Sequence, residues 1–314
     1  MVIALLFAIV WAASYYAMSY ACRRGKELDF NIDAEIERSH YKKHMDHILF
    51  ARNWLAEHPH EEICIRSYDG LELVGTFVPA ENARATLLMF HGWRSTPLVD
   101  FSRALPLYHA LGISLLIADQ RSHGRSQGRY ITYGVRERKD VHSWIAWHNG
   151  RFGADAPLLI TGLSMGATTV LMACGQPMPD NVRGVIADCG FTSPNDIIRK
   201  VARDMHPLAP YAVPLLGLQA RCFAGFGLKE CSTLDALKDF KKPVFLVHGT
   251  GDTFVPYEMT QAAHDACSSA DKTLLLVEGA GHGMSFIEDQ ETYVRLLTDF
   301  IERCLQSREN EEHL

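Results

Sequence analysis

LLITGLSMG, at residues 158–166, runs from apolar side chains straight into a serine between two glycines, and ATTVLMA follows it at residues 167–173. The first part is typical of a buried strand and the second of a helix, so Ser164 stands at their junction. A sharp strand-to-helix corner strains the backbone of its central residue and leaves no room for bulk two positions to either side. Gly162 and Gly166 meet that requirement, and the pattern predicts an exposed Ser164 hydroxyl at the corner.

Two further polar residues follow strand-like runs later in the chain. Asp252 comes after VFLVHG, residues 244–249, and His282 lies in the loop GAGHG, residues 279–283, after another apolar run. A serine hydroxyl becomes a useful nucleophile when a base takes its proton, and the base needs an acid to orient it. We therefore predict that Ser164 is the nucleophile, His282 the general base and acid, and Asp252 the orienting acid.

Other interpretations compete at the acid position. Asp252 precedes residues 255–259, which read as the start of a helix, so its carboxylate could be a helix cap. Asp188 follows the apolar residues 185–187 at the end of the preceding strand, so its carboxylate could serve as the acid instead. We favour Asp252 and keep Asp188 as the alternative.

These features together resemble the α/β-hydrolase superfamily, and the similarity runs from about residue 63 to residue 305. HGW at residues 91–93 resembles the superfamily's oxyanion loop, and DQRSHGRS at residues 119–126 resembles a loop of its monoacylglycerol-lipase-like and serine-aminopeptidase-like branch. Within that branch the chain is most similar to bacterial esterase-like members. The resemblance implies that the backbone N–H groups of Trp93 and Met165 form the oxyanion hole.

Strand-like and helix-like segments alternate from residue 85 onward, which predicts an α/β fold with a doubly wound, mostly parallel sheet. Alternating apolar residues between positions 63 and 77 flank a turn and predict an antiparallel hairpin at the sheet edge. We place the hydrolase domain at residues 61–305. An amphipathic linker helix, residues 23–60, is expected before it, and a polar tail, residues 306–314, after it.

The alternation breaks in a proline-punctuated apolar insert at about residues 191–242. We expect a small helical cap there, lying over the C-terminal edge of the sheet and walling the substrate pocket. The alternative is an excursion that packs on the core, because apolar residues in helices usually face a core. A cap of this composition favours an acyl or aromatic ester over a charged substrate.

The N-terminal segment is apolar, and residues 1–22 contain no charged side chain. A run of about 20 such residues is long enough to cross a bilayer. The basic residues Arg23, Arg24 and Lys26 all follow it, which predicts a single-pass transmembrane helix with the domain facing the cytoplasm. A cleaved signal that releases an exported enzyme, and a buried helix, are the alternatives.

Composition narrows the classes of partner and cofactor. The formal net charge is −6, from 31 basic and 37 acidic residues, so the chain repels polyanions and a nucleic-acid role is not expected. The sequence contains no CxxC, HExxH or Walker motif, so we expect neither a metal nor a nucleotide cofactor. Of the eight cysteines, Cys222 and Cys231 bracket a short loop and could form a disulfide.

These observations predict a membrane-anchored serine hydrolase. Its partner would be a small-molecule carboxylic ester with an acyl or small aromatic group, cleaved through an acyl-enzyme intermediate. A peptidase or a thioesterase that uses the same three residues is the enzymatic alternative. A catalytically silent binding or scaffold protein is the alternative from another class.

Overall fold

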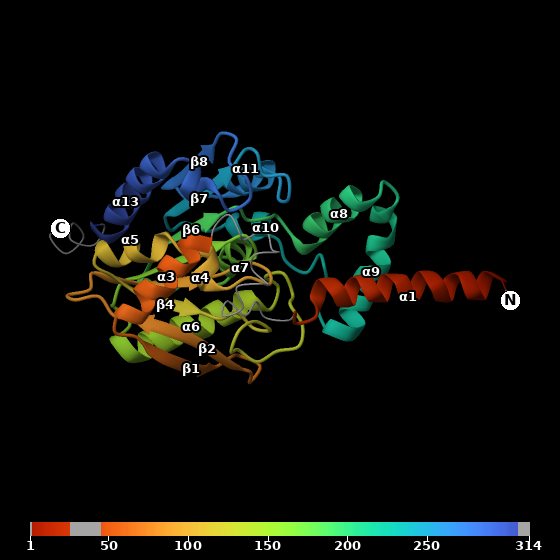
Figure 1. The fold of residues 1–314 in the computed structure, drawn as a ribbon, viewed down its shortest axis with the longest axis horizontal. Helices are drawn as coiled ribbons and strands as arrows, with labels where there is room; N and C mark the ends of the chain where they lie inside the picture. Colours follow the sequence, from red (N-terminus) through yellow and green to blue (C-terminus); the bar gives the residue numbers. More distant parts are fainter. Residues whose placement is uncertain (1, 26–44, 307–314) are drawn as a thin grey trace.

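The computed structural model describes residues 2–25 and 45–306, which form an α/β domain around one eight-stranded sheet (Figure 1). The strand order is β1-β2-β4-β3-β5-β6-β7-β8. The strands are β1 (Glu61–Arg66), β2 (Glu72–Val78), β3 (Ala85–Phe90), β4 (Ile113–Ala118), β5 (Leu158–Leu163), β6 (Val182–Asp188), β7 (Val244–Gly249) and β8 (Lys272–Val277).

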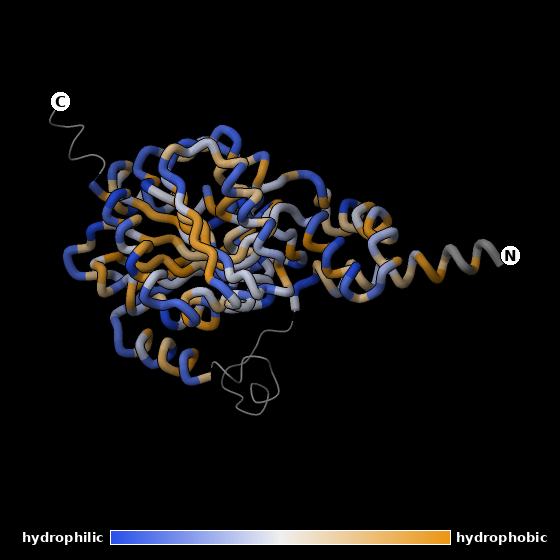
Figure 2. Tube along the Cα trace, turned by 90° about the horizontal axis from the view of Figure 1, so that it is seen from above, coloured by the Kyte–Doolittle hydropathy of each residue, from blue (hydrophilic) through white to orange (hydrophobic). Residues whose placement is uncertain are grey.

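Most of the sheet is parallel. β2 pairs antiparallel with β1 and with β4, and every other pair of neighbouring strands is parallel. The predictions of a mostly parallel sheet and of an antiparallel hairpin at its edge are confirmed. Parallel strands covered on both faces carry apolar side chains throughout, and Figure 2 shows hydrophobic strands crossing the middle of the domain.

Helices cover both faces of the sheet. One face packs against α6 (Glu137–Phe152), α7 (Met165–Ala173), α10 (Thr233–Leu237) and α11 (Tyr257–Ala266). The other face packs against α3 (Met45–Glu57), α5 (Ala104–Ala110) and α13 (Gln290–Gln306). Successive residues of a strand serve opposite faces, because Leu87 and Met89 of β3 join the second core and Leu88 and Phe90 the first.

The N-terminal segment forms α1 (Val2–Cys22), but the predicted transmembrane role is wrong. Among the described residues, no helix is long and apolar enough to cross a membrane. The second half of α1 packs on the rest of the protein instead. Met18 and Cys22 are fully buried, and the Gln219 side-chain amide donates a hydrogen bond to the Trp11 carbonyl at 3.0 Å. The predicted location, a single-pass membrane protein with a cytoplasmic-facing domain, is therefore wrong as well.

The insert at residues 191–242 is helical. It contains α8 (Pro194–Met205), η2 (Ala209–Ala212), α9 (Val213–Gln219), the π-helical turn η3 (Ala220–Ala224) and α10. α9 lies beside α1, at the side of the domain from which α1 projects (Figure 1). Apolar residues of the insert, such as Val213 and Leu216, share a core cluster with Met18 of α1. Cys222 and Cys231 are both free, so the disulfide considered above does not form.

The remaining boundaries predicted from the sequence fall only partly within the described residues. Of the linker helix expected at residues 23–60, residues 26–44 lie outside the described residues, and α3 occupies 45–57. Of the expected polar tail, residues 307–314 lie outside them. The division of the chain into these units stays a prediction.

A buried ion-pair cluster joins the hairpin to the helical layer. Arg121 lies in the loop after β4. Its guanidinium donates hydrogen bonds to both carboxylate oxygens of Asp140 in α6, at 2.5 and 2.6 Å. It also contacts Asp69 in the β1–β2 turn, at 2.9 and 3.1 Å. The Arg121 side chain is 2% exposed and that of Asp140 is 4% exposed. Removing one member of such a cluster leaves the other charge buried without compensation.

We expect Arg121→Leu to lower the free energy of unfolding by about 3 to 5 kcal/mol, because Asp140 then stays buried without its cation. Urea denaturation measures this loss as a shift of the midpoint at an unchanged slope. The matched control is Arg84→Leu, which breaks an exposed pair with Glu302 and is expected to cost about 1 kcal/mol or less. Equal losses for the two variants would contradict the buried-cluster argument.

Candidate active site

Ser164 occupies a strained corner between β5 and α7. Its backbone has φ 55° and ψ −116°, in a region that L-residues rarely adopt. A Cβ atom on Gly162 would lie 2.2 Å from the Gly166 carbonyl carbon, and one on Gly166 would lie 1.9 Å from the Phe90 carbonyl oxygen. Both positions therefore require glycine. The Ser164 N–H donates to the Asp188 carbonyl at 2.8 Å, which fixes the corner to the neighbouring strand.

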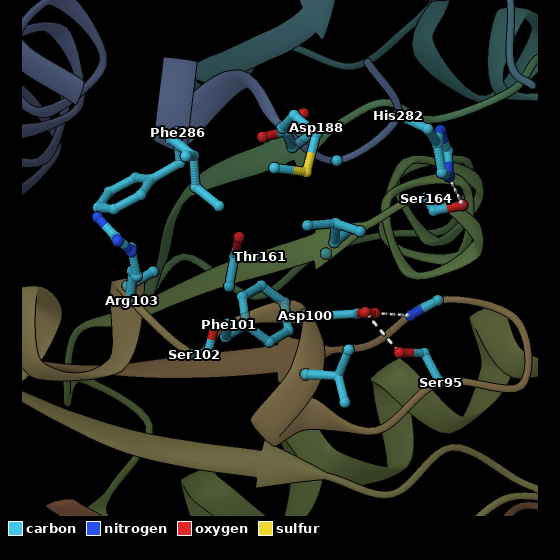
Figure 3. A pocket seen from close by; sticks show the side chains of 18 of the residues that line it. Ser95, Asp100, Phe101, Ser102, Arg103, Thr161, Ser164, Asp188, His282 and Phe286 are labelled. Carbon is cyan, nitrogen blue, oxygen red and sulfur yellow. Dashed lines mark hydrogen bonds between the residues drawn. The ribbon is translucent and has the colours of Figure 1, made fainter. Parts of the chain in front are cut away.

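The structure brings Ser164, His282 and Asp252 together at the C-terminal edge of the sheet. Ser164 Oγ lies 2.9 Å from His282 Nε2, and Figure 3 shows this contact. His282 Nδ1 lies 2.6 Å from Asp252 Oδ2. His282 belongs to the loop between β8 and α12 (Ser285–Glu288), and Asp252 to the turn after β7. The three side chains form one continuous relay from a hydroxyl to a carboxylate.

Asp252 is held as an anion. Its Oδ1 accepts hydrogen bonds from the backbone N–H groups of Phe254 and Val255, both at 2.9 Å. Burial acts to raise the pKa of the Asp252 carboxyl, but hydrogen bonds to His248 and His282 outweigh burial and hold that pKa well below its usual range. An ionised Asp252 can accept the proton on His282 Nδ1 in a hydrogen bond and leave Nε2 free to act as a base.

Asp188, the alternative acid, is hydrogen-bonded to Tyr293 and not to His282. Its Oδ2 accepts a hydrogen bond from the Tyr293 hydroxyl of α13 at 3.2 Å. Among the hydrogen bonds of the described residues, His282 contacts Asp252 and not Asp188. The geometry thus favours Asp252 as the partner of the imidazole, and Asp188 lies on the neighbouring strand, paired with Leu163, the residue before Ser164.

The loop that contains Trp93 runs beside Ser164, because a Cβ on Gly92 would lie 3.3 Å from the Ser164 Cβ. Met165 is the first residue of α7, so its N–H lies at the positive end of that helix. The resemblance implied these two N–H groups as oxyanion donors, and both belong to segments next to Ser164, which suits that role. Their assignment remains a proposal.

Asp100 holds the loop at residues 92–95 in place through two hydrogen bonds, a role that could not be seen in the sequence. The residue ends α4 (Pro97–Asp100), and its carboxylate accepts hydrogen bonds from the Gly92 N–H and the Ser95 hydroxyl, both at 2.5 Å. Burial raises the pKa of the Asp100 carboxyl, and these hydrogen bonds oppose the rise. Nothing local in the sequence marks Asp100, since it acts on a residue eight positions away through the shape of the loop.

The C-terminal end of α1 is hydrogen-bonded to Trp93 and Arg94 of the same loop. The Ala21 carbonyl accepts hydrogen bonds from Trp93 Nε1 at 3.0 Å and from the Tyr133 hydroxyl at 2.9 Å. Arg94 Nη2 donates to the carbonyls of Tyr20, at 2.6 Å, and of Arg23, at 3.1 Å. The N-terminal helix therefore belongs to the support of the site, although it lies far from Ser164 in the sequence.

A pocket of about 760 Å³ opens beside Ser164 (Figure 3). Its walls come from the loop at residues 92–95, from α4 and α5, from the ends of β5 and β6, and from residues 282–287. Much of the lining is apolar, formed by Val99, Phe101, Leu163, Met284, Phe286 and Ile287.

The insert does not wall this pocket. Among the described residues that line it, none belongs to residues 191–242, which contradicts the predicted role of the insert as a cap over the substrate. Apolar residues of the insert pack elsewhere instead: Val213 and Leu216 share a core cluster with Met18 of α1, and α10 packs on the sheet side of the domain.

Comparisons with known proteins agree with this architecture. Residues 99–308 match the sequence profile of the prolyl oligopeptidase family. The uncharacterized protein YqkD of Bacillus subtilis is 26% identical over 78% of this chain and 80% of its own. Caffeoylshikimate esterase of Arabidopsis thaliana is 25% identical over 72% of this chain and 80% of its own. The structure of the Pyrococcus furiosus esterase Pf2001 superposes with a TM-score of 0.65 at 21% identity, over 78% of this chain and 91% of that one.

Proposed function

Because this chain belongs to the prolyl oligopeptidase family, and through it to the α/β-hydrolase superfamily, we propose that it is a serine hydrolase that cleaves carboxylic esters. One observation carries the proposal, the continuous relay of short contacts from the Ser164 hydroxyl through His282 to Asp252. A buried, ionised acid behind a histidine that contacts a strained serine is the arrangement that nucleophilic acyl transfer requires.

The reaction proceeds in two halves. His282 Nε2 takes the proton of Ser164 as Oγ attacks the carbonyl carbon, and the tetrahedral oxyanion is bound by the backbone N–H groups of Trp93 and Met165. His282 then gives that proton to the departing alcohol, which leaves an ester on Ser164. In the second half His282 deprotonates a water molecule, which attacks this ester, and His282 returns the proton to Ser164 Oγ as the acid leaves. Asp252 stays ionised throughout and stabilises the imidazolium.

The pocket supports an ester of an acyl or small aromatic group. Its apolar side chains from α4, α5 and α12 give an aliphatic or aryl group a place to be buried next to Ser164. Caffeoylshikimate esterase and the Pf2001 protein are named as esterases, which agrees with this choice. The name of the matched family favours a peptidase as the second candidate.

Matched substrates separate these candidates. The 3-phenylpropanoyl group would be offered to the full-length protein as its p-nitrophenyl ester, its thiophenyl ester and its p-nitroanilide, with alanyl p-nitroanilide as the peptidase substrate. Each kcat/KM is divided by the rate of the same reaction without protein, since esters are intrinsically more reactive. We expect the oxygen ester to show the largest acceleration. If the alanyl anilide shows the largest acceleration, the protein is a peptidase, and if the thioester does, it is a thioesterase. If no substrate is accelerated, the protein is not a catalyst for these reactions.

A further inference from the structure

One carboxylate in the pocket has hydrogen-bonding capacity that the protein does not fill. Asp188 lines the pocket and is 5% exposed. Its Oδ2 accepts one hydrogen bond, from Tyr293 at 3.2 Å, and its Oδ1 has no hydrogen-bond partner among the described residues. A carboxylate offers about four acceptor sites, and buried polar groups in native proteins are nearly always paired. Oδ1 itself is enclosed, so a molecule in the pocket can use this capacity only at the part of the carboxylate that lines the pocket.

Asp188 is close to where the acyl group would sit. It ends β6 and pairs with Leu163 of β5, the residue before the nucleophile. Neighbouring strands lie about 4.8 Å apart, so a group a few bonds beyond the scissile carbonyl can reach the carboxylate. Figure 3 shows Asp188 at the edge of the pocket, with Thr161 and Phe286 around it. The catalytic relay leaves Asp188 unused, because His282 contacts Asp252.

The surroundings indicate what kind of donor fits. Aromatic residues from three helices and the loop between α4 and α5 line the pocket, and they are Phe101, Tyr108, Phe286 and Tyr293. Arg94 and Arg103 line it as well and disfavour a cationic ligand, while Asp100, the other acid, is already occupied by Gly92 and Ser95. Burial raises the pKa of Asp188 to about 6, so at neutral pH its carboxyl is ionised and acts as an acceptor. A neutral hydroxyl on an aryl or alkyl chain meets these conditions.

Resting on the proposed function, we propose that Asp188 selects esters whose acyl group carries a hydroxyl a few bonds beyond the scissile carbonyl, and that its carboxylate accepts the hydrogen bond from that hydroxyl. The hydroxyl supplies a further donor to a carboxylate that accepts one hydrogen bond within the described residues, from Tyr293. An acyl group without the hydroxyl displaces water but offers the carboxylate no hydrogen bond. The free-energy cost of this unpaired carboxylate makes the site reject the ester that lacks the hydroxyl. Asp188 is then a residue of substrate specificity.

Two esters that differ by one hydroxyl test this. Methyl 3-hydroxy-3-phenylpropanoate and methyl 3-phenylpropanoate would be hydrolysed by the full-length protein at pH 8, and the measured quantity is the ratio of their kcat/KM values. We expect the hydroxylated ester to be preferred about 10- to 100-fold, the range for a hydrogen bond to a charged group. Asp188→Leu removes the acceptor and should bring the ratio close to one. Asp188→Asn keeps a neutral acceptor and should lower the ratio only in part.

The matched control is Asp180→Leu, the same change at a side chain that is 90% exposed, and it should keep the wild-type ratio. Two results would overturn the inference. One is a wild-type ratio near one. The other is that Asp188→Leu lowers both rates equally and leaves the ratio unchanged, because Asp188 would then act on the structure or the charge of the site.

If Asp188→Leu does not fold, as judged by circular dichroism, an unchanged ratio in Asp188→Asn overturns the inference instead. Labelling by a fluorophosphonate probe distinguishes failure of this inference from failure of the proposed function. If the protein is labelled but does not prefer the hydroxylated ester, only the role of Asp188 is wrong. If the protein is neither labelled nor active, the proposed function is wrong.

Discussion

Ser164→Ala is expected to abolish labelling by a fluorophosphonate probe and to lower kcat for ester hydrolysis by about 10⁵-fold. The probe forms a covalent bond with an activated hydroxyl, and Ser164 Oγ is the hydroxyl that the structure places 2.9 Å from His282 Nε2. The residual rate would come from substrate binding and from the proposed oxyanion hole, which the substitution leaves in place. In-gel fluorescence measures the labelling, and pre-steady-state release of p-nitrophenol measures the acylation step.

The control for this experiment is Ser269→Ala. Ser269 is also buried, but its hydroxyl contacts the carbonyls of Lys241 and Asp271, away from the relay. This variant should label and turn over as the wild type does. Undiminished labelling of Ser164→Ala would place the reactive hydroxyl elsewhere and end the assignment of the nucleophile.

Asp252→Asn is expected to lower kcat by about 10⁴-fold while the protein stays folded. The amide has the shape of the carboxylate and can still accept from the N–H groups of Phe254 and Val255. It cannot accept the Nδ1 proton and stabilise an imidazolium with a full negative charge, so His282 would favour the wrong tautomer for taking a proton from Ser164.

The comparison variant for Asp252→Asn is Asp188→Asn, assayed on methyl 3-phenylpropanoate, which lacks a hydroxyl. Asp188 bonds to Tyr293 and not to the imidazole, so we expect a far smaller fall in kcat. The acid assignment would be wrong if Asp188→Asn caused the larger loss. Thermal denaturation of both variants shows whether either loss reflects unfolding.

The central part of the fold and the meeting of three side chains could be predicted from the sequence because their signals are local. Each of Ser164, Asp252 and His282 follows an apolar strand and stands in a turn that contains glycine. Parallel strands end at one edge of their sheet, so residues in these positions converge. The steric need for Gly162 and Gly166 is likewise a property of a single corner.

The parts that could not be predicted depend on contacts between distant segments. The hydropathy of residues 1–22 does not reveal that α1 packs on α9 and that its end is bonded to Trp93 and Arg94. The apolar insert was expected over the pocket, but some of its apolar side chains pack with α1 and others join the core on one face of the sheet. Asp100 and Asp188 gain their surroundings only when α4 and α13 pack onto the sheet.

The Ala21 carbonyl, bonded to the Trp93 indole and the Tyr133 hydroxyl, has a practical consequence for anyone who produces this protein. A recombinant version shortened to begin after residue 25 would keep the whole relay, yet its indole and the Arg94 guanidinium would lose the oxygens that hold them. Turnover numbers from such a shortened protein would describe a loop at residues 93–94 that is held less firmly beside Ser164, so kinetic work needs the polypeptide with its first helix in place.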